Sequence, residues 1–205
     1  MKTSKILIAA AALCAAMAAN AQVSGQAVGS SSGTFLQLSS AGLSNGSTQV
    51  ASLMGGTVYT ADQPFADIPK GALFGNNFLA AGPTSGAPAK LSFLNGGVSF
   101  VSFLWGSPDK YNKLTVTSTV GLPQTFDSTN ITFASSTGNQ AYSQYVAFTG
   151  QNGAKITSLS FDNVPAIDAF ESANYSITPV PEPETYALLL AGLGVVGFVA
   201  RRRRT

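Results

Sequence analysis

Residues 91–105 read LSFLNGGVSFVSFLW, and this stretch decides the fold class of the chain. Apolar residues interrupted by single Ser residues lie on both sides of Asn95-Gly96-Gly97, within a chain whose patterning is mostly the two-residue periodicity of β-strands, clearest at residues 113–120. Asn-Gly tolerates the positive φ angles of a tight hairpin turn. We therefore predict strands at residues 91–94 and 98–105, joined as a β-hairpin.

The same periodicity recurs through residues 22–178, between clusters of Gly, Pro and Asn, and no ten-residue amphipathic helical pattern interrupts it. Many short strands without crossover helices favour an antiparallel β-sandwich or jelly roll over a parallel sheet. The sequence predicts further strands at 113–120, 130–134, 142–148, 156–161 and 169–177, weaker ones at 33–38, 49–53 and 57–59, and a long loop at 75–88.

The composition excludes several classes of chemistry. The chain has 205 residues and no His, so Ser-His-Asp catalysis, Cys-His catalysis and the common His-containing zinc sites are absent. Residues 22–178 hold five Lys against seven Asp and Glu, a net charge of 5 − 7 = −2, and form no basic stripe for nucleic acid. We predict no catalytic residue, no metal and no cofactor.

The N-terminus has the order of a secretory signal peptide. Lys2 and Lys5 precede an apolar run at residues 6–19, and Ala19-Asn20-Ala21 supplies the small residues that signal peptidase accepts. The run is shorter than the roughly 20 residues that span a bilayer. We expect signal peptidase to remove residues 1–21, including Cys14, the single thiol.

The C-terminus combines a stiff linker, an apolar helix and a basic stop. Val180-Pro181-Glu182-Pro183-Glu184 precedes an uncharged segment at residues 185–200, which we predict to be a transmembrane helix. These 16 residues give a span of only about 24 Å. The stop signal then consists of Arg201, Arg202, Arg203 and Arg204, which favour the cytoplasmic side.

This order of residues resembles the PEP-CTERM sorting signal of Gram-negative bacteria. In that family exosortase, a membrane-embedded cysteine protease, recognises and cleaves the region, often in cells that produce exopolysaccharide. The resemblance places the recognition motif at Pro181, Glu182 and Pro183 of residues 179–205. It implies export across the inner membrane, transient anchorage through residues 185–200, and release to the cell surface or the exterior.

Residues 103–114, FLWGSPDKYNKL, resemble a Trp-Gly-Ser-x-Asp-x-Tyr-Asn stretch found in a group of exosortase-dependent surface proteins. One interpretation is a carbohydrate-binding edge formed by Trp105, Asp109, Tyr111 and Asn112, because aromatic faces stack on sugars while carboxylates and amides bind hydroxyls. The other makes Trp105 a core residue, and makes Asp109 and Ser107 turn formers that bond nearby amides. We favour the second, because turn chemistry explains most of the motif.

Asp162, Asp168 and Glu171 are candidates for a glycosidase pair or a calcium site, although we favour strand ends in a final hairpin. Three functions remain open. The first is a non-enzymatic surface or matrix protein, sorted by exosortase and associated with exopolysaccharide. The second is a secreted hydrolase using Asp109, Asp162 or Glu171, and the third is a permanently anchored structural protein.

Overall fold

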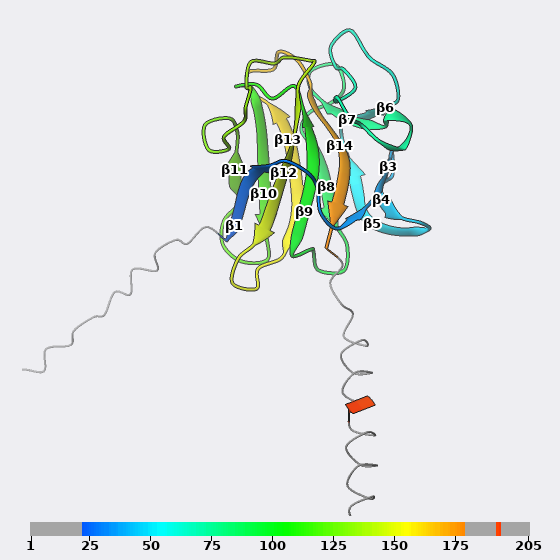
Figure 1. Cartoon of the computed structure of the whole chain (residues 1–205), viewed down its shortest axis with the longest axis vertical. Coiled ribbons are helices and arrows are strands. Elements are labelled where there is room, and N and C mark those ends of the chain that lie inside the picture. The colour runs from blue at the N-terminus through cyan, green and yellow to red at the C-terminus, as the bar shows by residue number, and fades with distance from the viewer. Residues whose placement is uncertain (1–21, 179–191, 194–205) are drawn as a thin grey trace, which may run out of the picture.

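The computed structural model describes residues 22–178 and 192–193. Residues 22–178 form two antiparallel β-sheets packed face to face (Figure 1), which confirms the predicted all-β sandwich. The predicted signal peptide at residues 1–21 lies outside the described residues. So does the predicted sorting segment at 179–205, apart from residues 192 and 193.

The first sheet has β9 and β14 near its centre and β1 and β6 at its edges. In spatial order it contains β1 (Val23–Val28), β12 (Ser143–Gly150), β9 (Phe100–Gly106), β14 (Phe170–Ile177), β7 (Phe78–Ala81) and β6 (Thr57–Tyr59), and β2 (Thr34–Phe35) also pairs with β14.

The second sheet packs its inner face against the first. In spatial order it contains β11 (Gln124–Phe126), β10 (Asn112–Ser118), β13 (Ile156–Asn163), β8 (Ala89–Phe93), β5 (Thr48–Met54), β4 (Gly42–Asn45) and β3 (Gln37–Ser39). The predicted alternation is clearest in β10, where Asn112, Leu114 and Val116 face inward and are buried while the residues between them are half-buried.

The strands predicted within residues 91–105 exist, but the predicted hairpin is wrong. β8 pairs with β13 and β5 in the second sheet, whereas β9 pairs with β12 and β14 in the first. Asn95, Gly96 and Gly97 do take positive φ angles, yet they turn the chain from one sheet to the other. β9 lies near the centre of the first sheet, between β12 and β14, and its residues are therefore buried on both faces.

The predicted final hairpin is also wrong, because β13 lies in the second sheet and β14 in the first. Two further predictions fail locally. The predicted loop at 75–88 contains β7, whose four residues are all buried between β14 and β6, and residues 130–134 form no strand. Two-residue periodicity identifies strands, but it does not identify their partners.

Aromatic rings fill the space between the sheets. The ring of Phe103 on β9 lies 5.4–6.0 Å, centroid to centroid, from those of Trp105, Phe148, Phe161 and Tyr175. Such pairs contribute about 0.5–1.5 kcal/mol each beyond their burial. The core therefore connects both sheets through one aromatic cluster.

A smaller apolar cluster covers the outer face of the first sheet. Phe78 and Ala173 on the strands pack with Ala66 and Phe65 from the segment between β6 and β7. A backbone bond from the amide of Ala169 to the carbonyl of Phe65, 3.2 Å long, ties this segment to the start of β14. The segment thereby forms one wall of a pocket at that end of the sandwich.

The sandwich has two distinct ends, which we name by their place in Figure 1. At the upper end Gly106, the last residue of β9, pairs with Ser143 and Glu171, the beginnings of β12 and β14. At the lower end Ile177, the last residue of β14, pairs with Val101 and Thr34.

Candidate functional site

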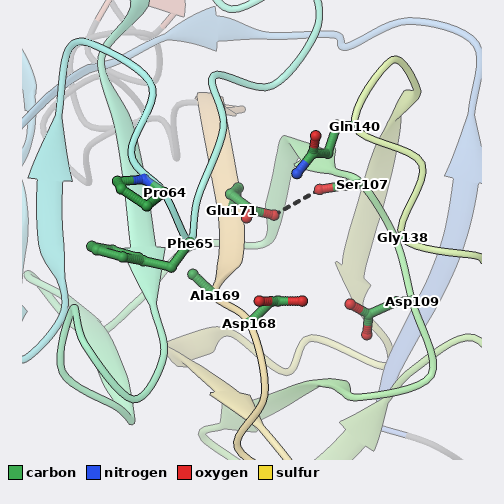
Figure 2. Close-up of a pocket in the computed structure, with 9 residues that line it drawn as sticks. All are labelled: Pro64, Phe65, Ser107, Asp109, Gly138, Gln140, Asp168, Ala169 and Glu171. Atoms are coloured by element: carbon green, nitrogen blue, oxygen red, sulfur yellow. Dashed lines mark hydrogen bonds between the residues drawn. The ribbon is translucent and has the colours of Figure 1, made fainter.

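A pocket of about 70 Å³ opens at the upper end, between the segment before β7, the turn after β9 and the start of β14 (Figure 2). Three of its lining side chains are carboxylates, of which Asp109 is distant in the sequence from Asp168 and Glu171. The lining residues are Pro64, Phe65, Ser107, Asp109, Gly138, Gln140, Asp168, Ala169 and Glu171.

Glu171 is the most deeply buried carboxyl group of the pocket, with 4% of its surface exposed. Ser107 donates a hydrogen bond from its Oγ to Glu171 Oε2 at 2.9 Å. Burial raises the pKa of Glu171 to about 8, and the nearby Asp109 and Asp67 charges add to the rise, although the Ser107 bond opposes it. Glu171 is therefore largely protonated and uncharged at neutral pH.

Asp109 organises the turn that follows β9. Its Oδ1 accepts hydrogen bonds from the amides of Tyr111 at 2.6 Å and Asn112 at 2.9 Å, while Asn112 Oδ1 accepts one from the amide of Asp109 at 3.2 Å. Burial raises the pKa of Asp109, with the Asp168 charge adding to the rise and the amide bonds opposing it. In Figure 2 the carboxylates of Asp109 and Asp168 extend toward one another across the pocket.

Ser107 has a role that the sequence did not predict. It was expected to bond a nearby amide, but its hydroxyl instead donates to Glu171, 64 positions away in the chain. Its φ of 34° lies in the left-handed region, which non-glycine residues rarely adopt. The turn itself, Gly106 to Asp109, is where the sequence predicted it.

The predicted carbohydrate-binding residues divide into two groups. Trp105 and Asn112 have no exposed surface, so neither can touch a sugar in this conformation. Trp105 stacks on Phe170 with ring centroids 4.2 Å apart and donates from Nε1 to Asn112 Oδ1 at 3.1 Å. Both residues are part of the core; the interpretation that the sequence favoured placed Trp105 there and did not assign Asn112.

The other two predicted residues reach the surface. Tyr111 is 37% exposed and Asp109 is half-buried. Together they line a second hollow of about 220 Å³, whose remaining walls are Lys110, Ser136 and Thr137. Asp109 lines both hollows, so the two are neighbours on the upper end.

Of the three candidate carboxylates Asp162, Asp168 and Glu171, the fold brings only the last two together. Asp168 and Glu171 line the first pocket together with Asp109, whereas Asp162 accepts a bond from the amide of Asn163 and lies opposite Lys113 in the sheet. Across residues 22–178 and 192–193, no three acidic or thiol side chains lie close enough to hold a metal ion.

Several residues of this site were not recognised in the sequence. Phe65 and Gln140 come from loops without a chemical motif, and Asp67 acts on Glu171 only through its charge. Burial, followed by the Asp62 charge, raises the pKa of Asp67. The one sequence feature that pointed to a site here was Glu171, an acidic residue in a strand that is otherwise uncharged.

The predicted sorting residues, Pro181 to Pro183 and Arg201 to Arg204, lie outside the described residues. In the part of the chain that the structure describes, no helix is long and apolar enough to cross a membrane. The predicted transmembrane helix at 185–200 therefore stays a prediction.

Comparison with known protein families identifies the C-terminus. Residues 179–204 match the PEP-CTERM protein-sorting motif, which confirms the predicted resemblance. The motif indicates exosortase-dependent sorting of an exported protein. No curated protein and no solved structure matches the chain.

Proposed function

We propose that this chain is a non-enzymatic surface or extracellular-matrix protein that exosortase processes at its C-terminal motif. The observation that carries the proposal is the match of residues 179–204 to the PEP-CTERM protein-sorting motif. Signal peptidase removes residues 1–21, residues 185–200 hold the protein in the membrane transiently, and cleavage releases residues 22–178 as a folded β-sandwich.

The mass of the extracellular protein tests this route. At 21.0 kDa for 205 residues, cleavage near the Pro-Glu-Pro motif removes about 2.5 kDa beyond the signal peptide. We expect this loss in cells with exosortase and a cell-bound, uncut chain in cells without it. Extracellular protein that retains its Arg residues contradicts the proposal and supports permanent anchorage or another route.

A matched pair of variants locates the recognition. Glu182→Ala changes the acidic residue inside the Pro-Glu-Pro motif, and we expect it to block release. Glu184→Ala removes the same side chain two positions later, outside the motif, and we expect normal release. Equal release of both variants would show that exosortase does not read Glu182.

The upper end is suited to contact with exopolysaccharide, and we include this contact in the proposal. Tyr111 offers an exposed aromatic face, Asp109 and Asp168 offer acceptors for sugar hydroxyls, and Ser136 and Thr137 offer hydroxyls. Both hollows are smaller than the roughly 300–1,000 Å³ of ordinary small-molecule sites. A chain lying across the surface fits them better than an engulfed ligand.

Affinity electrophoresis in gels containing the exopolysaccharide of the producing cells tests this contact. We expect the sugar to retard the protein, and Tyr111→Ala to reduce the retardation without lowering the midpoint of urea unfolding. Leu122→Ser, an exposed apolar change at the lower end, is the control and leaves retardation unchanged. Equal retardation of all three proteins contradicts a contact at Tyr111.

A secreted carboxylate-dependent hydrolase is the second candidate, because Asp109, Asp168 and Glu171 line one pocket. A protonated Glu171 is suited to general-acid chemistry. In that case the released protein generates new reducing ends in the polysaccharide, and Glu171→Gln abolishes them. We expect no such activity, because a pocket of about 70 Å³ leaves no room for a sugar ring between the carboxylates.

A further inference from the structure

The charges of the sandwich are distributed unequally between its two ends. Glu171 pairs with Gly106 at the upper end, and Asp127 bonds Lys113, one residue from the start of β10. All seven carboxylates of residues 22–178 belong to the loops or strand ends of this upper part: Asp62, Asp67, Asp109, Asp127, Asp162, Asp168 and Glu171.

The lower end is formed by the loops at residues 94–99, 119–123 and 150–155. Backbone bonds hold these loops together: Thr119 donates to Lys155 at 2.8 Å, and Gly150 donates to Ser99 at 2.9 Å. Their sequences contain no acidic residue, and Lys155 is their one charged side chain. An anionic surface would therefore meet no carboxylate from these loops.

Apolar side chains project from the same loops. Leu122 is 85% exposed, Val120 51% and Leu94 40%. Single exposed apolar residues are common, but here three occur on two loops of one end that also lacks acidic residues. Exposed apolar side chains without acidic neighbours can enter the interfacial region of a lipid membrane.

The chain leaves the sandwich at this end. β14 ends at Ile177, and Thr178 is the last described residue before the sorting motif. Residues 179–184 separate it from the apolar segment that begins at Thr185, and six residues of any chain can span at most about 20 Å. While that segment is in the membrane, the lower end is held within this distance of the lipid surface.

We propose that the lower end rests on the lipid surface before cleavage, with Leu122, Val120 and Leu94 in the interfacial region and Lys155 facing anionic headgroups. The contact rests on the proposed anchorage of residues 185–200. It holds the upper end away from the membrane, and it keeps the Pro-Glu-Pro motif at the membrane surface, where an embedded protease can reach it. After cleavage the contact weakens, because three side chains and one charge give only reversible binding.

A fluorescent probe at the loop tip tests the contact. The chain from Gln22 onward contains no Cys, so Leu122→Cys gives a single labelling site for an environment-sensitive nitrobenzoxadiazole dye. The labelled full-length mature chain is reconstituted in vesicles of phosphatidylethanolamine and phosphatidylglycerol. We expect a several-fold rise in emission and quenching by lipids that carry a quencher in the headgroup region. Lys110→Cys, at the upper end, is the matched control and should report water.

The outcomes separate this inference from the sorting proposal. An aqueous signal from the Leu122→Cys label in vesicles that exosortase still processes overturns the membrane contact and leaves sorting intact. A buried signal without vesicles at the same protein concentration also overturns it, because a second copy then covers the loop. A double change, Val120→Asp with Leu122→Asp, should remove the membrane signal of a dye placed at Leu94→Cys.

Discussion

The two ends of the sandwich are built on the same strands but differ in charge, because all seven carboxylates of residues 22–178 belong to the upper part and none to the three lower loops. At the upper end polar side chains are buried and bonded to one another, as in the bond between Ser107 and Glu171. At the lower end Leu122 and Val120 are exposed, and Lys155 is the one charged side chain of the three loops. The strands thus supply a rigid scaffold, and each set of loops can serve a different partner.

The largest expected effect is a loss of stability at the upper end, in the core beneath the turn at residues 106–109. Trp105→Ala removes a fully buried ring that stacks on Phe170 and bonds Asn112. We expect the free energy of unfolding to fall by about 3–5 kcal/mol, measured by urea denaturation. Trp105→Phe keeps the stacking and loses the Nε1 bond, so it should cost less.

A small effect of Trp105→Ala accompanied by lost polysaccharide binding would contradict this assignment. It would mean that the indole reaches the surface in solution. Trp105 would then belong to the binding surface of the upper end and not to the core.

The second prediction concerns the buried acid of the upper end. The pKa of Glu171 is raised from 4.5 to about 8 in the folded protein, so the folded state holds a proton that the unfolded state releases. Stability from this group is fully present below pH 4.5 and is lost as the pH rises toward 8, at up to about 1.4 kcal/mol per pH unit. The raised pKa values of Asp109 and Asp67 act in the same direction.

Glu171→Gln tests the sign of this effect, because its amide oxygen can still accept the Ser107 bond. We expect the variant to show a flatter dependence of unfolding free energy on pH between 5 and 8 and to exceed the wild type at pH 8. Asp127→Asn is the control, because the carboxyl group of Asp127 titrates at a lower pH than the range from 5 to 8. Burial alone would raise the pKa of Asp127, but bonds from Lys113 and Thr129 lower it to about 2.

The smallest expected effect lies at the lower end. Leu122→Ser replaces a side chain that is 85% exposed, so the free energy of unfolding should change by less than about 0.5 kcal/mol. Membrane association of the anchored chain should nevertheless weaken. A large loss of stability would show that Leu122 packs against the protein in solution and is unavailable to lipid.

The site could be predicted only in part. The turn at residues 106–109 followed from Pro108 and Asp109, because these residue types favour turns wherever they occur. The pocket did not follow, since it joins Ser107, Asp168 and Phe65 from segments up to about a hundred positions apart. Their proximity depends on which strands are neighbours, and periodicity carries no such information.

The sequence by itself determined the strand-rich composition, the turn residues and the sorting motif, because each depends on local residue types and their spacing. The tertiary structure alone decided that 91–94 and 98–105 belong to opposite sheets, that Asn112 is buried, and that Glu171 meets Ser107. These results depend on long-range strand pairing, where burying the aromatic core between two sheets outweighs the local preference of Asn95-Gly96 for a hairpin.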